Sequence, residues 1–254
     1  SLAAIVNGAG NNTSGGTWDE VNLCFSVAPT SCISAGLNSF IGNGFQNSAC
    51  NSYGTVLNGT TNAVTGTYSS IINGLSNTSS TDHTFIGAGC SNNVICNFGL
   101  IGGGKSNYVA SIYSYIGNGD TNCVGAVASV TCFNTIVNGK SNLVDNAYSS
   151  VIGGTINNAS ACFATIVNGS TNCASNFSSF IGGGCLNDNA ACTTHCYNYI
   201  GNGYDNTVYN DYATSVNGTL NTASDLNATV LNGSTNIASA CYATVVNGFT
   251  NTAS

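Results

Sequence analysis

Residues 68–78 read YSSIINGLSNT, and residues 148–159 repeat the same order of residue types as YSSVIGGTINNA. Residues 242–253, YATVVNGFTNTA, give the pattern a third time. Each copy has an aromatic residue, two small residues, an apolar pair, a glycine corner and an asparagine three residues after the glycine. A short unit repeated along a whole chain indicates a fold made of one small element stacked on itself.

The spacing of the glycine–asparagine pairs sets the period of the repeat. From Gly44 onward the steps between glycines are 15 residues, except for one of 20 and one of 19. The glycines are Gly8, Gly44, Gly59, Gly74, Gly89, Gly104, Gly119, Gly139, Gly154, Gly169, Gly184, Gly203, Gly218, Gly233 and Gly248.

The residue types within one unit favour strands and turns. Ile71–Ile72, Val151–Ile152 and Val245–Val246 have high strand propensity. Asn-Gly suits corners that need a positive φ, and frequent glycines disfavour a helix. We therefore predict an all-β fold, a parallel β-solenoid (β-roll) of about fifteen 15-residue coils, as a single domain over residues 1–254.

Stacked coils would place identical residues above one another, about 4.8 Å apart. The asparagines of the repeat then form a ladder, in which amide groups can bond from donor to acceptor. The predicted ladder is Asn47, Asn62, Asn77, Asn92, Asn107, Asn122, Asn142, Asn157, Asn172, Asn187, Asn206, Asn221, Asn236 and Asn251. Ile, Val and Leu columns would fill a thin core, with an aromatic column nearby.

Some units read FIGNGFQN or FIGAGCSN, from Phe40 and Phe85. These units have one more residue between the apolar pair and the asparagine. We interpret the extra residue as a β-bulge that keeps the coil length constant.

Three segments interrupt the period: an irregular insertion at 9–39 and shorter loops near 123–134 and 185–198. Cysteines bracket all three. Local disulfides at the loop bases are expected, each worth about 2 to 3 kcal/mol. The expected pairs are Cys24–Cys32, Cys123–Cys132 and Cys185–Cys196. In the third loop, Cys185, Cys192, His195 and Cys196 could instead be a Cys₃His zinc site.

The composition excludes several classes of function. Only 4% of the residues are charged, and two lysines stand against nine acidic residues. Nucleic-acid binding depends on Lys and Arg, so this partner is not expected. No apolar run reaches the roughly 18 residues of a membrane span. No catalytic constellation or cofactor motif is visible, so we expect a protein that is not an enzyme and binds no cofactor.

The cysteine count and several Asn-x-Ser/Thr sequons suggest an extracellular or cell-surface location, where glycans are permitted partners. The chain has no methionine and no signal peptide, as expected of a processed mature chain.

The units YSSVIGGTINNAS (148–160), YSSIINGLSNTS (68–79) and FSSFIGGGCLNDNA (177–190) resemble the YadA-like head repeats of trimeric autotransporter adhesins. The resemblance covers residues 40–254. It implies a left-handed parallel β-roll, three chains to a head, and binding to host surfaces. The cysteines and the absence of a heptad stalk depart from that family. A second, weaker similarity, seen in NAVTG (62–66), is to plant ice-binding solenoids.

The two ends of the sequence both lie within a repeat. Writing the last residues before the first gives VVNGFTNTAS-SLAAIVNG, with the glycines 14 residues apart. Head-to-tail contacts of this kind generate a filament. We therefore expect an extracellular structural protein that polymerises with itself, with bundling or trimerisation left open. The expected interface residues are Leu2, Ile5, Val6, Val245, Val246 and Phe249. An adhesin head, an ice-binding protein and a fragment of a longer repeat protein remain alternatives.

Overall fold

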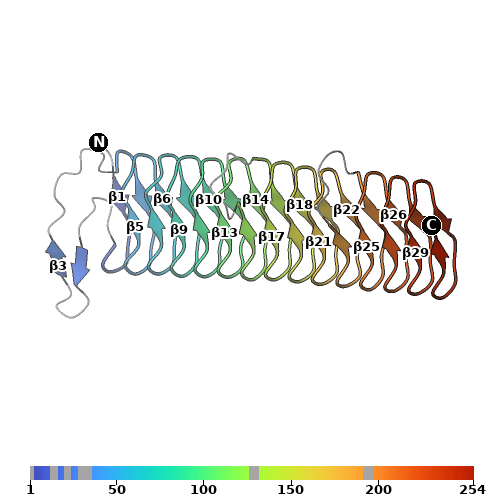
Figure 1. The fold of residues 1–254 in the computed structure, drawn as a ribbon. Helices are drawn as coiled ribbons and strands as arrows, with labels where there is room; N and C mark the ends of the chain where they lie inside the picture. The colour runs from blue at the N-terminus through green and yellow to red at the C-terminus, as the bar shows by residue number, and fades with distance from the viewer. Residues whose placement is uncertain (1–2, 12–16, 20–23, 28–35, 126–131, 191–196) are drawn as a thin grey trace. The chain divides into compact units, whose positions relative to one another are not determined.

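A computed structural model describes residues 3–11, 17–19, 24–27, 36–125, 132–190 and 197–254. The chain forms two compact units, Ser1–Thr121 and Asn122–Ser254. Each unit is a stack of coils, and each regular coil contributes one strand to a first sheet and one to a second sheet (Figure 1). The described residues contain strands, bridges and turns and no helix. The predicted parallel β-solenoid is therefore confirmed, while its left-handed sense and its single-domain organisation stay predictions.

In the first unit, strands of the same sheet follow one another at 15-residue intervals from Phe40 onward and pair in parallel. The first sheet holds β1 (Ala4–Ile5), β4 (Phe40–Ile41), β6 (Thr55–Val56), β8 (Ser70–Ile71), β10 (Phe85–Ile86), β12 (Leu100–Ile101) and β14 (Tyr115–Ile116). The second sheet holds β5 (Ser48–Ala49), β7 (Ala63–Val64), β9 (Thr78–Ser79), β11 (Asn93–Val94) and β13 (Tyr108–Val109).

The second unit repeats this arrangement. Its first sheet holds β16 (Thr135–Ile136), β18 (Ser150–Val151), β20 (Thr165–Ile166), β22 (Phe180–Ile181), β24 (Tyr199–Ile200), β26 (Thr214–Ser215), β28 (Thr229–Val230) and β30 (Thr244–Val245). Its second sheet holds β15 (Cys123–Val124), β17 (Leu143–Val144), β19 (Asn158–Ala159), β21 (Cys173–Ala174), β23 (Asp188–Asn189), β25 (Thr207–Val208), β27 (Thr222–Ala223), β29 (Ile237–Ala238) and β31 (Thr252–Ala253).

The irregular insertion is shorter than the predicted span of 9–39, because residues at both ends of that span belong to regular coils. Ala9 bridges to Phe45, and the Asn11 amide accepts the Asn47 N–H, so the first coil continues to Asn11. The coil pattern resumes at Gly36. Between them, the backbones of β2 (Thr17–Asp19) and β3 (Cys24–Val27) form an antiparallel pair.

Each sheet contributes a single layer of side chains to the core. In a two-residue strand the first side chain faces outward and the second inward, because successive residues point to opposite faces. The inward residues of the first sheet are mostly Ile and Val, and Ile71, Ile86 and Ile101 are fully buried. Ser215 occupies the same position with a fully buried hydroxyl that has no hydrogen-bond partner.

Each regular coil turns through three left-handed residues, of which only the first is regularly glycine. In the coil from Ser70, Gly74 has φ 125°, Ser76 φ 55° and His83 φ 58°. Residues other than glycine cost roughly 1–2 kcal/mol in this region. The sequence predicted the glycine corner. It did not predict that aromatic residues such as Tyr68 (φ 56°) would occupy the third position.

The predicted β-bulge in the Phe-Ile-Gly units is wrong. Phe40 pairs with Thr55 and Ile41 with Val56, with no shift of register. The aromatic residue therefore takes the outward position that Ser or Thr holds in other coils, and the following glycine lies beside its ring. A Cβ on Gly42 would lie 3.3 Å from a ring carbon of Phe40.

Candidate functional site

The asparagine ladder is the most regular polar feature of both units. The Oδ1 of Asn62 accepts the backbone N–H of Asn77 at 3.1 Å, and its Nδ2 donates to the carbonyl of Gly74 at 2.8 Å. The same two bonds recur from coil to coil, and the ladder side chains are buried except at Asn251. The amide-to-amide bonds that the sequence predicted are present at several rungs, such as Asn92 to Asn77 at 3.1 Å.

The ladder therefore bonds mainly to backbone, which the stacking argument alone did not anticipate. Each amide connects the turn of its own coil to the glycine corner of the next coil. The sequence prediction also missed Asn11, whose Nδ2 donates to the Gly44 carbonyl at 3.0 Å. Its signal was present, because Asn11 follows Gly8 at the spacing of every other pair.

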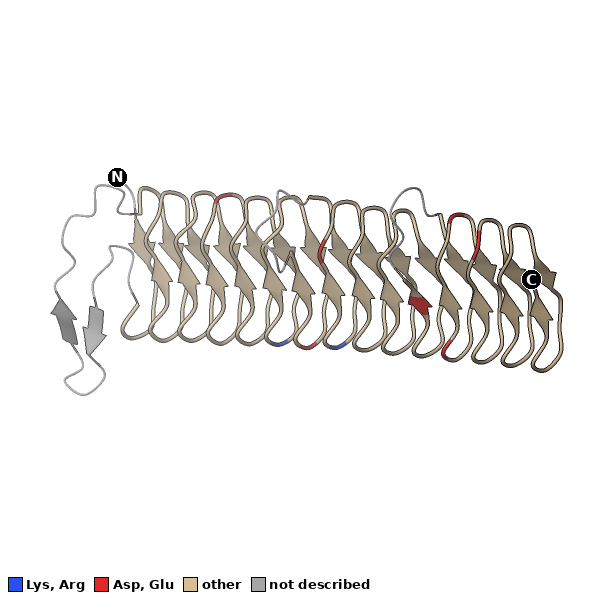
Figure 2. Ribbon diagram, viewed as in Figure 1, with Lys and Arg blue, Asp and Glu red and all other residues tan. Residues whose placement is uncertain are grey.

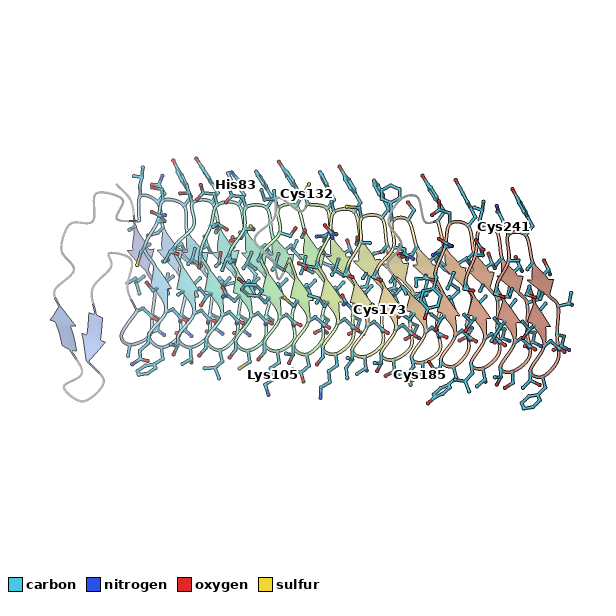
Figure 3. All side chains as sticks on the ribbon, viewed as in Figure 1. His83, Lys105, Cys132, Cys173, Cys185 and Cys241 are labelled. Atoms are coloured by element: carbon cyan, nitrogen blue, oxygen red, sulfur yellow. The ribbon has the colours of Figure 1, made fainter. Side chains whose placement is uncertain are left out.

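A column of aromatic residues runs along the edge of the coils opposite the glycine corners. In the first unit, Tyr53, Tyr68, His83, Phe98 and Tyr113 stack with ring centroids 4.5–5.3 Å apart. In the second unit, Phe133, Tyr148 and Phe163 stack, as do Tyr197 and Tyr212. Figure 3 shows His83 at this edge and Lys105 at the other. We call these residues the aromatic column; it lies on the outside of the coils, half-exposed.

The predicted disulfides are not supported by the described cysteines. Cys123 and Cys132 are both free, so the predicted Cys123–Cys132 bond is not formed. Cys185, in the turn after its glycine corner, is also free, so the predicted Cys185–Cys196 bond is not formed either. Cys32 and Cys196 lie outside the described residues. Cys123 and Cys132 are close in sequence but not in the coil, because Cys123 is the outward residue of β15 whereas Cys132 lies at the edge of the aromatic column, next to Phe133 (Figure 3).

The predicted zinc cluster is only partly covered by the structure, since Cys192, His195 and Cys196 lie outside the described residues. Within the part of the chain that is described, no group of three or more His, Cys, Asp or Glu side chains could hold a metal ion.

Charged residues are sparse on both units (Figure 2). Asp188 and Cys173 are register partners on β23 and β21. Burial raises the pKa of Asp188, and a hydrogen bond with the Cys173 thiol lowers it in part. Burial and the neighbouring Asp188 both raise the pKa of Cys173. The raised pKa disfavours the thiolate of Cys173 near neutral pH, and the thiolate is the nucleophilic form of cysteine.

Several Asn-x-Ser/Thr sequons differ in their exposure. Asn58, Asn168, Asn217 and Asn232 are exposed residues just before corner glycines, so a glycan could be attached there. Asn77 is a buried ladder residue, and Asn176 is also buried. Those two sequons are matches of composition alone.

Among the described residues, the strands that contain or adjoin the predicted interface residues pair on one side only. β1 pairs with β4, and β30 pairs with β28. Ile5, Val6, Val246 and Phe249 are exposed, whereas Val245 points inward and is buried. Leu2 lies outside the described residues.

The described residues include no helix that could span a membrane. No protein-family model and no curated protein matches this chain.

Proposed function

We propose that the protein is an extracellular structural protein, the subunit of a filament formed by head-to-tail stacking of solenoid coils. The observation that carries the proposal is the match between the open strand edge at β30 and β31 and the open edge at β1. Strand addition to an exposed edge is a common mode of protein association, because main-chain hydrogen bonds supply the contact.

The N–H donors of the last coil correspond individually to carbonyl acceptors of the first coil. Between coils, the N–H groups of Thr229 and Leu231 donate to the carbonyls of Ala243 and Val245. The equivalent donors of the last coil are the N–H groups of Thr244 and Val246. The equivalent acceptors of a following copy would be the carbonyls of Ala3 and Ile5, because Ala4 holds the coil position of Phe40.

The ladder gives the same match at a second point. The Asn251 side chain donates to the Asn247 carbonyl, and no described residue donates to its Oδ1. In the repeat, that oxygen accepts the N–H of the next ladder asparagine and the Nδ2 donates to the next glycine. Asn11 and Gly8 of a following copy hold those two positions.

The contact would also bury apolar surface. Val246 and Phe249 on one copy would meet Val6 and Ala9 on the next, at matching coil positions. Burial of apolar area is favourable by roughly 25 cal/mol per Å². The low charge of the chain adds little repulsion to such stacking.

The extracellular location rests on the likeness to YadA-like heads and on the exposed sequons. Disulfides would have been a further argument for an extracellular location, but nine of the cysteines are free.

Electron microscopy of the purified full chain tests the proposal. We expect unbranched filaments whose axial repeat equals the coil stack of one copy. The variant Thr244→Pro/Thr252→Pro removes two N–H donors from the unpaired edges of β30 and β31, since proline has no N–H group. This variant should form no filaments. The matched control Thr244→Val/Thr252→Val keeps both donors and should still polymerise. A monodisperse monomer of the unmodified chain would refute the filament, and a discrete trimer would favour an adhesin head.

A further inference from the structure

The aromatic column brings two tyrosines face to face at two places. Tyr53 and Tyr68 stack with ring centroids 4.5 Å apart and an interplanar angle of 9°. Tyr197 and Tyr212 stack at 5.4 Å and 7°. Each pair joins residues 15 positions apart, on successive coils.

The other stacked tyrosines in the column have different neighbours. Tyr113 stacks on Phe98. Tyr148 lies between Phe133 and Phe163. The column therefore contains tyrosine pairs and, as an internal comparison, tyrosines flanked by phenylalanine.

The backbone fixes the spacing of the paired rings. Tyr53 and Tyr68 are both left-handed residues, with φ 58° and 56°, on neighbouring coils. The Tyr68 N–H donates to the Ser52 carbonyl of the preceding coil at 3.1 Å. Tyr197 and Tyr212 likewise have positive φ, 44° and 57°. The ring overlap thus follows from the coil repeat.

Both pairs are accessible to a small oxidant. The exposed fractions are 39% for Tyr53 and 54% for Tyr68. They are 47% for Tyr197 and 50% for Tyr212. Within each pair, the facing sides of the two rings are occupied by the partner ring. The exposed parts are the ring edges and hydroxyl groups.

We propose that Tyr53–Tyr68 and Tyr197–Tyr212 are sites of oxidative cross-linking, each forming one dityrosine bond between successive coils. The co-reactant is hydrogen peroxide, used by a peroxidase. Each phenol loses one electron and one proton to give a phenoxyl radical. The two radicals couple through ortho carbons, and both coupled carbons lose their hydrogen as the rings regain aromaticity. One peroxide molecule accepts two electrons and two protons and leaves as two water molecules.

The stacked geometry suits the coupling step. The unpaired spin of a phenoxyl radical at the ortho carbons lies in lobes perpendicular to the ring. Parallel overlapping rings point these lobes at each other. The rings must then swing so that the new bond lies in both ring planes, and their exposed edges leave room for that movement. The closer pair, Tyr53–Tyr68, should react in higher yield.

The cross-link would clamp neighbouring coils from outside, at the edge away from the asparagine ladder. It depends on the coil stack of each unit by itself and stands whether or not the chain forms filaments.

The test treats the dilute full chain with peroxidase and hydrogen peroxide and analyses the monomer band after denaturing electrophoresis. We expect dityrosine fluorescence in this band and two cross-linked peptide pairs, each lighter by two hydrogen atoms than its uncoupled peptides. Tyr68→Phe should remove the first pair, and Tyr212→Phe the second. Both substitutions keep an aromatic ring in the stack, so the fold is preserved.

The matched control is Tyr148→Phe, which removes a tyrosine of similar exposure that has no tyrosine neighbour. It should leave both peptide pairs unchanged. Retention of monomer fluorescence in the Tyr68→Phe/Tyr212→Phe double variant would overturn the proposal. Dityrosine confined to dimers and larger species of the unmodified chain would also overturn it.

Discussion

Replacing Asn77 by alanine should destabilise the coils around it by about 1.5–4.5 kcal/mol. The Asn77 Oδ1 accepts the Asn92 N–H at 2.9 Å, and its Nδ2 donates to the Gly89 carbonyl at 2.9 Å. Loss of the side chain orphans the buried Asn92 N–H, which costs roughly 1–3 kcal/mol. The Gly89 carbonyl keeps the Leu75 N–H, so the second lost bond adds only about 0.5–1.5 kcal/mol.

Amide hydrogen exchange is the suitable measurement, because coils in a solenoid can open locally. The Asn92 amide should lose most of its protection, and the midpoint of denaturant unfolding should fall. Asn251→Ala is the matched control. Its amide is exposed and donates only to the Asn247 carbonyl, so the loss should stay below about 1 kcal/mol. Equal effects of the two substitutions would refute the view that the ladder holds neighbouring coils together.

Three further predictions concern single positions. Gly154→Ala should be strongly destabilising, because φ is 91° and the new Cβ would clash with the Gly169 carbonyl oxygen. Gly153→Ala should be tolerated, since the atom nearest to its new Cβ is the Asn168 Oδ1 at 3.7 Å. The thermal unfolding midpoints of the two variants test this difference. Ser215→Val should stabilise the protein by about 1–3 kcal/mol in denaturant unfolding, because it replaces a buried unpartnered hydroxyl with the residue type of Val230, and the outward Thr214→Val should change little. Asp188→Asn should stabilise the protein at neutral pH. The raised pKa means that the folded carboxyl favours its proton, so stability falls as pH rises through the folded pKa; the advantage of the variant should vanish below about pH 4, where the acid is neutral in both states.

The sequence predicted the fold because its strongest signal is local and repeated. A glycine and an asparagine three residues later specify the same turn in every coil, and the period specifies the stacking. Because successive residues of a strand face opposite sides of the sheet, the inward apolar residue of each strand forms the core. These features depend on spacing along the chain, which a sequence shows directly.

The errors came from features that spacing does not fix. The Phe-Ile-Gly units were aligned by their apolar residues, but Phe40 faces outward and only Ile41 faces the core. Left-handed tyrosines were missed because tyrosine has no intrinsic preference for that conformation; the coil imposes it. The cysteine pairs were chosen by proximity in sequence, and Cys123, Cys132 and Cys185 are free in the structure.

The location of the candidate sites was less predictable than the fold. The aromatic column was expected beside the core, and its position on the outer edge is what exposes the tyrosine pairs. His83 holds an aromatic position of the repeat and stacks between Tyr68 and Phe98.

The uniformity of the ladder has a consequence for how the chain folds. Asn62 bonds to the Asn77 N–H and the Gly74 carbonyl, and the Asn92 N–H and Gly89 carbonyl of the next coil offer the same two groups, so the ladder cannot distinguish a correct neighbour from one skipped by a whole coil. Correct counting must come from positions that differ between coils, such as His83 in a run of tyrosines or Ser215 in a run of isoleucine and valine. Chains that miscount would be trapped in compact, mispaired forms, and slow annealing of such forms would accompany refolding from denaturant.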